Sequence, residues 1–183
     1  DYPLTLSAVS NFANMDWPAF DRAAKQGSNF VDWVAARLDA AVASYREQFA
    51  RYPHCDTIQL LHEQGGRDLA ECVKRAEPTP VGEYRGAEGN RQVYWCAEYA
   101  KRMRREFPDK KICIGNGSSS SQMIEALCLD GFDLSLVDQL GIESKGFASM
   151  PELKANRESP GMLWALRETG RKFGYTNFTM NAC

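Results

Sequence analysis

One carboxylic acid stands out in this sequence because it lies just after the end of a predicted strand. Glu63 comes after Thr57-Ile-Gln-Leu-Leu61 and His62, and before Gln64-Gly65-Gly66. Paired glycines let a ligand approach the backbone closely, and a well-placed carboxyl group can act as a general acid. The imidazole of His62 can donate a hydrogen bond to a ligand or shift the pKa of its neighbour. We predict that Glu63 is catalytic and His62 binds substrate; the alternative is a solvated carboxylate at a strand end.

A second group of candidates lies near the start of the chain. The apolar and β-branched run Leu4–Val9 is followed by a polar stretch that contains Asn11, Phe12 and Trp17. This order is typical of a buried strand that ends in a ligand-facing loop. The flat faces of aromatic side chains suit the apolar face of a pyranose sugar. We predict that Asn11 and Trp17 bind substrate, the alternative being rings that pack beneath the loop.

Two further acids follow a later apolar run. Asp133–Val137 has the composition of a short strand, and Asp138 and Glu143 come after it. In a parallel sheet, residues after a strand lie at the edge where barrel enzymes build their active sites. We predict that Asp138 and Glu143 bind substrate, and either one is a candidate second carboxylate.

Other kinds of active site find no support in the sequence. The run Ser118–Ser121 is not part of a GxSxG motif, and only His54 and His62 could serve as its base. No GxGxxG or GxxxxGK[ST] motif follows a predicted strand, so we expect no nucleotide cofactor. The cysteines form no CxxC or CxH pair, so we expect no metal site and mostly reduced, structural thiols. They are Cys55, Cys72, Cys96, Cys113, Cys128 and Cys183.

The spacing of apolar residues predicts strands that alternate with helices. The expected strands are Leu4–Val9, Thr57–Leu61, Lys111–Gly115, Asp133–Val137 and Tyr175–Met180. The expected helices run from Asn29 to Pro53, from Asn90 to Phe107, from Met123 to Leu129 and from Ser159 to Gly174. Residues 67–89 are expected to form a long connection with one short helix. Such βαβ units predict a parallel sheet with right-handed crossovers.

These elements predict an α/β fold in which residues 1–183 form one domain. Polar residues after the strand ends favour a parallel (β/α) barrel, or a segment of one, over an open nucleotide-binding sheet. The chain starts with Asp1-Tyr2-Pro3, without Met or a signal-peptide pattern, so we expect it to begin inside a larger protein.

The overall composition argues against two classes of partner. A formal charge of -2 gives none of the basic excess that nucleic-acid binding requires. No run approaches the roughly 20 apolar residues of a membrane-spanning helix. We expect neither a nucleic-acid nor a membrane partner.

The order and spacing of these elements resemble strands three to seven of the (β/α)8 glycoside hydrolases of the large retaining clan often called clan A. The resemblance covers nearly the whole chain. In that clan the third strand runs into an aromatic loop, as Leu4–Val9 does, and the fourth ends in an Asn-Glu pair whose Glu is the acid/base. Ile58-Gln-Leu-Leu-His62-Glu63 matches this place, with His62 instead of Asn. Lys111–Gly117 resembles the fifth strand, Asp133–Val137 the sixth, and Phe173-Gly174 the approach to the seventh.

This resemblance implies a retaining glycoside hydrolase with a carbohydrate substrate. Glu63 would donate a proton to the leaving glycosidic oxygen, and a second carboxylate would attack the sugar. The clan carries that nucleophile on strand seven, which would place it at or just beyond Cys183. The resemblance therefore implies a partial or truncated barrel.

Two other interpretations stay open. A non-catalytic carbohydrate-binding barrel is favoured by His62 in the place of Asn and by the lack of a visible nucleophile. Alternatively, five strands do not close a barrel and leave two open edges, which further strands or a partner chain must cover.

Overall fold

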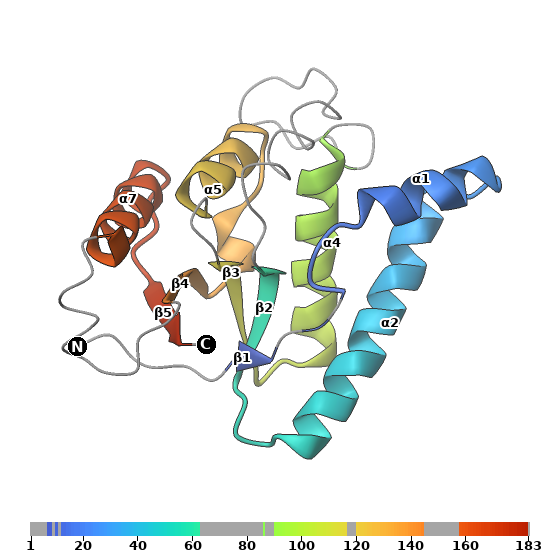
Figure 1. Cartoon of the computed structure of the whole chain (residues 1–183), viewed down its shortest axis with the longest axis horizontal. Helices are drawn as coiled ribbons and strands as arrows, with labels where there is room; N and C mark the ends of the chain where they lie inside the picture. Colours follow the sequence, from blue (N-terminus) through green and yellow to red (C-terminus); the bar gives the residue numbers. More distant parts are fainter. Residues whose placement is uncertain are drawn as a thin grey trace.

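The computed structural model describes residues 7–8, 10, 12–62, 86, 90–116, 120–144 and 158–182. These residues form a mixed α/β structure with a parallel sheet of five strands (Figure 1). The strands are β1 (Ser7–Ala8), β2 (Thr57–His62), β3 (Lys111–Asn116), β4 (Gln139–Ser144) and β5 (Phe178–Ala182). The prediction of an α/β fold with a parallel sheet is therefore confirmed.

The strands lie side by side in the order in which they occur along the chain. Each neighbouring pair is parallel, and Leu60 of β2 lies opposite Ile114 of β3, which in turn lies opposite Leu140 of β4. Right-handed crossovers that always advance in one direction place the connecting helices on the same face of the sheet. Helices α2, α4, α5 and α7 follow one another around the sheet in chain order, from right to left in Figure 1.

The two faces of the sheet differ in chemistry although both are buried. The helix-covered face is aliphatic, and its side chains are fully buried in the hydrophobic core. They are Ile58, Leu60, Ile112, Ile114 and Leu140. The alternate positions carry Thr57, Gln59, Cys113 and Gln139, of which none is more than 3% exposed. A parallel sheet buried on both faces is the usual arrangement, because each face must exclude water.

The described helices are α1 (Trp17–Lys25), α2 (Phe30–Arg51), α4 (Arg91–Glu106), α5 (Ser120–Leu129) and α7 (Glu158–Lys172). The predicted starts of α2 and α4 are confirmed, because Asn29 and Asn90 cap these helices. Asn29 accepts from Asp32 N and Asn90 accepts from Gln92 N, both at 2.9 Å. The spacing of Val34, Leu38 and further apolar residues gives α2 a buried stripe, as predicted. The described part of 67–89 is Gly86 alone, so the expected long connection and its short helix lie outside the described residues.

The predicted strand Asp133–Val137 is wrong. Leu134–Leu136 form a 3₁₀ helix, η2, and β4 begins only at Gln139. The side chain of Asp133 accepts a hydrogen bond of 2.8 Å from Ser135 N and so begins this helical turn. A local bond between an Asp side chain and the backbone competes with extended structure. The last strand also starts later than predicted, at Phe178 instead of Tyr175.

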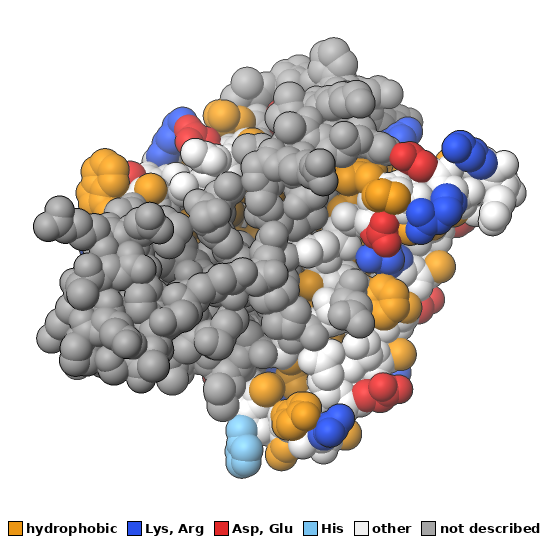
Figure 2. Space-filling model, viewed as in Figure 1, with side chains coloured by type: hydrophobic (Ala, Val, Ile, Leu, Met, Phe, Trp, Pro, Cys, Tyr) orange, Lys and Arg blue, Asp and Glu red, His pale blue; other side chains and the backbone are white. Residues whose placement is uncertain are grey.

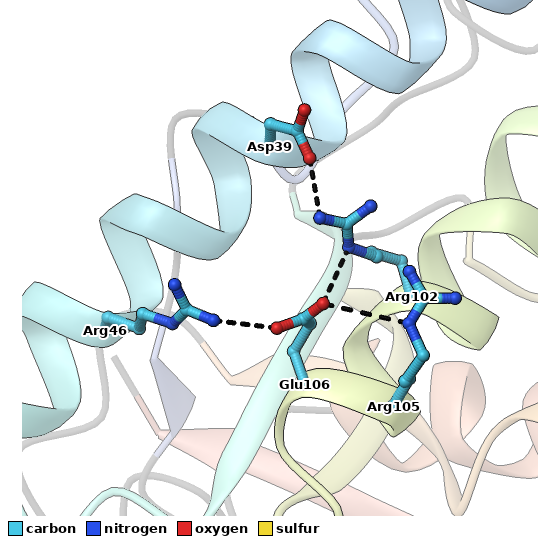
Figure 3. Close-up of polar contacts among 5 residues, drawn as sticks. All are labelled: Asp39, Arg46, Arg102, Arg105 and Glu106. Carbon is cyan, nitrogen blue, oxygen red and sulfur yellow. Dashed lines mark hydrogen bonds and ion pairs between the residues drawn. The ribbon is translucent and has the colours of Figure 1, made fainter.

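The two longest of the described helices, α2 and α4, are joined by an ionic network (Figure 3). Glu106 of α4 lies 2.8 Å from Arg46 of α2 and 3.1 Å from Arg102 of α4. Arg102 also pairs with Asp39 of α2 at 2.6 Å. The network therefore fixes α4 against α2.

Candidate functional site

The carboxyl ends of the parallel strands form one edge of the sheet, and sequence-predicted site residues lie there. His62 is the last residue of β2 and lies opposite Asn116, the last residue of β3. Glu143 is the second-last residue of β4 and lies opposite Asn181 of β5. Glu63 follows His62 in the chain and, like Asn11, lies outside the described residues. Asn116 and Asn181 were missed, although a polar residue that directly follows an apolar run is the same pattern that drew attention to His62.

The backbone is strained one residue before His62. Leu61 has φ of 59°, and among the described residues it is the only non-glycine with positive φ. This conformation costs a side chain of L configuration about 1 to 2 kcal/mol. Leu61 is nevertheless buried, and its N–H donates to Ala13 O at 3.2 Å. Such strain persists only where the surroundings enforce it, and it occurs often at functional sites.

The segment after β1 is held near this edge by a partly buried arginine, Arg37. The guanidinium of Arg37 lies 5.2 Å from the ring centre of Phe12 and 5.4 Å from that of Trp33. It donates to Asn14 O at 3.3 Å and lies 3.9 Å from a carboxylate oxygen of Asp16. Desolvation lowers the pKa of Arg37, and the nearby Asp16 carboxylate opposes that shift. Arg37 therefore ties the segment 12–16 to α2.

The prediction that Trp17 lies in an open loop is wrong. Trp17 is the first residue of α1 and is only 4% exposed. Asp16 caps this helix by accepting from Ala19 N at 2.9 Å, and Pro18 is favoured in a first turn because its missing N–H is not needed there. The indole of Trp17 belongs to the hydrophobic core and has no open face for a sugar.

Asp138 was predicted at the carboxyl ends of the strands, but it lies at their amino ends. It precedes β4, and its carboxylate accepts from Ile112 N near the start of β3 at 2.7 Å. The same oxygen pairs with Arg104 of α4 at 2.7 Å. These bonds give Asp138 a structural role at the amino ends of the strands, so it does not belong to the candidate site.

Two cavities between described residues also lie at the amino ends of the strands. One of about 320 Å³ is lined by Arg167, Arg171 and residues 176–178. The other, of about 420 Å³, is lined mainly by residues 132–135 and 173–175, together with Cys128. Burial raises the pKa of the Cys128 thiol to about 12, with smaller contributions from Asp133 and Glu125, so this thiol is protonated at neutral pH.

Surface charge, possible metal ligands and helix hydrophobicity bear on which partners the protein could bind. Figure 2 shows acidic and basic side chains interspersed over α1 and α2 on one face of the molecule. Within the described ranges, no group of three or more His, Cys, Asp or Glu side chains is placed to hold a metal ion. No described helix combines the length and the apolar character needed to cross a membrane.

Comparison with known proteins adds no relative from which a function could be transferred. No protein-family model, curated protein or solved structure matches this chain.

Proposed function

We propose that this protein is a carbohydrate-active (β/α)-barrel protein that hydrolyses glycosidic bonds, with Glu63 as its acid/base. The observation that carries the proposal is the strand register. It brings the end of β2, at His62, and the end of β4, at Glu143, to the same edge of a parallel sheet. Glu63 is the residue after His62, and parallel (β/α) folds build their active sites at this edge.

The order of the strands supports the barrel. In a (β/α) barrel the strands follow chain order and the helices cover only the outside, whereas doubly wound sheets reverse direction and carry helices on both faces. The described strands follow chain order without reversal. The buried row of Gln59, Cys113 and Gln139 on the other face would then line the barrel interior. We propose that further strands or a partner chain complete the sheet beyond β1 and β5.

Glu143 is the second carboxylate that we propose. Strands β2 and β4 are separated only by β3, so their backbones are about 9.6 Å apart at the usual spacing of ~4.8 Å. Side chains that converge across this distance can reach the carboxyl separation of about 5 to 5.5 Å that retaining hydrolysis needs. A wider separation, about 6.5 to 9.5 Å, would give inversion instead.

In the proposed reaction Glu63 acts first as an acid and then as a base, and Glu143 is the nucleophile. Glu63 donates its proton to the glycosidic oxygen as the bond to the anomeric carbon breaks, and the Glu143 carboxylate bonds to that carbon. Glu63, now ionised, removes a proton from water, and the resulting hydroxide displaces Glu143 and releases the sugar. His62 donates a hydrogen bond to a substrate hydroxyl beside Glu63.

The experiment measures hydrolysis of a panel of aryl glycosides that differ in leaving-group pKa. The variant Glu63→Gln is expected to lose most activity on poor leaving groups and least on dinitrophenyl glycosides, which need no proton. Glu143→Gln is expected to lose activity on all of them, by about 10²-fold or more. Glu98→Gln, which removes an acid from the exposed side of α4, serves as the control.

Three results would contradict the proposal in different ways. Unchanged rates in Glu63→Gln would remove Glu63 from the mechanism. Loss of activity in Glu63→Gln but not in Glu143→Gln would leave the acid/base in place and remove the second carboxylate. Calorimetric binding of oligosaccharides by the wild type without any hydrolysis would identify a non-catalytic binding protein.

A further inference from the structure

The amino edge of the sheet carries a small basic pocket that the proposed hydrolysis does not use. This pocket, of about 320 Å³, is lined by Arg167 and Arg171 of α7 and by Thr176, Asn177 and Phe178, where β5 begins. His62 and Glu143 lie at the carboxyl edge of the same sheet. A ligand in the basic pocket would therefore be bound away from the proposed catalytic residues.

The wall of the basic pocket depends on a glycine. Gly170 of α7 is buried, and a Cβ atom at this position would lie 2.7 Å from Cζ of Phe178 and 2.9 Å from the backbone oxygen of Tyr175. Only glycine therefore allows the Phe178 ring to lie directly against α7 beside the two arginines. The amide of Asn177 donates to the backbone oxygen of Asp138, which holds the neighbouring chain in place.

The donors in the basic pocket suit an oxyanion. Arg167 and Arg171 are four residues apart on α7, so they lie on the same side of the helix. One nitrogen of Arg171 pairs with Glu168 at 2.5 Å. A guanidinium has five N–H donors in a planar fork, so a single carboxylate does not saturate it. Arginine forks bind carboxylate and phosphate groups with two parallel hydrogen bonds, and Thr176 can add a hydroxyl donor.

We propose that the basic pocket binds a small oxyanion, a phosphate or carboxylate group, on a molecule whose apolar part contacts Phe178. Arg167 and Arg171 bind the charged group, and Glu168 competes with it for Arg171. This proposal does not depend on the glycosidase assignment, because the two sites share no residue.

The test is a titration of the full chain with inorganic phosphate, phenyl phosphate and benzoate at constant ionic strength, followed by calorimetry and by the NMR signals of the arginine Nε–H groups. Saturable shifts of the Arg167 and Arg171 signals are expected with at least one of these probes. Phenyl phosphate is expected to bind more tightly than inorganic phosphate, because its ring can contact Phe178. Tighter binding of phenyl phosphate than of benzoate would identify phosphate as the preferred group, and the reverse would identify carboxylate.

Single substitutions distinguish binding at a specific site from a general effect of positive charge. Arg167→Gln and Arg171→Gln are each expected to weaken binding by about tenfold or more. Glu168→Gln is expected to tighten binding, since it removes the competing carboxylate. Arg22→Gln is the matched control, because Arg22 is an exposed arginine in the last turn of α1. Equal effects in Arg22→Gln and Arg171→Gln, or signals that drift without saturating, would overturn the proposal.

Discussion

The hydroxyl of Tyr99 donates a hydrogen bond of 2.8 Å to the hydroxyl of Tyr45, between α4 and α2. Tyr45 in turn donates to the backbone oxygen of Gln59 in β2 at 3.1 Å. Both side chains are completely buried. Two helices and a strand that are distant in the sequence are thus joined by consecutive hydrogen bonds, as buried polar groups require.

Removing the two hydroxyls separately should have unequal effects. Tyr45→Phe leaves the buried Tyr99 hydroxyl without its acceptor and Gln59 without this donor, so a loss of about 1 to 3 kcal/mol in unfolding free energy is expected. Tyr99→Phe leaves the bond from Tyr45 to Gln59 intact and should cost about 0.5 to 1.5 kcal/mol. Urea denaturation of both variants and of the double variant measures these values. Equal losses, or additive ones, would show that the two hydroxyls do not act together.

Alkaline pH should destabilise the protein. Burial raises the pKa of Tyr45, Tyr99 and Tyr175 above the ordinary value of 10.0. Above that pH the unfolded chain loses phenolic protons that the folded chain keeps, so the unfolding free energy falls as pH rises. The stabilisation is complete below pH 10, where the phenols are protonated in both states. Urea midpoints from pH 8 to 11 check this, and the decline above pH 10 should be shallower in Tyr45→Phe/Tyr99→Phe.

Glu106→Gln should loosen the contact between α2 and α4. The Glu106 side chain is 19% exposed, accepts a hydrogen bond from Arg46 and forms an ion pair with Arg102, while Arg105 lies 3.8 Å away. A partly exposed network of this kind is expected to contribute about 1 kcal/mol, and less at high salt. Thermal unfolding at low and high salt measures this. Glu98→Gln is the control, since Glu98 pairs with Lys101 of the same helix. A loss of the same size there would contradict a special role for Glu106.

Gly170→Ala should destabilise α7 although alanine favours helices. The added Cβ would overlap the Phe178 ring and the Tyr175 backbone oxygen, and such overpacking costs about 1 to 3 kcal/mol. Trimming the ring in Gly170→Ala/Phe178→Leu should recover part of this loss. Gly27→Ala is the comparison, because Gly27 has φ of 92° and open space around it, so its cost is purely conformational. Phe178→Leu should not rescue Gly27→Ala, and chemical denaturation of the four variants tests both statements.

Local patterns predicted the elements whose sequence signals lie within a single segment. Asn29, followed by apolar residues at steps of three and four, predicts α2, because the cap and the stripe are properties of one segment. The β-branched and apolar composition of Thr57–Leu61 likewise predicts β2. The alternation of such segments was enough to predict a parallel α/β sheet.

Tertiary structure decided where those elements bring their side chains. Asp138 follows a segment of strand-like composition, yet its bonds to Ile112 N and to Arg104, both distant in the sequence, place it at the amino edge of the sheet. The sequence around Trp17 has no periodic pattern that would tell a buried ring from an exposed one. Only packing against other segments places Trp17 in the core. The register that sets His62 opposite Asn116 joins residues 54 positions apart, and no local pattern encodes such a pairing. Periodicity fixes which face of a segment is apolar, whereas contacts between distant segments fix which polar residues meet.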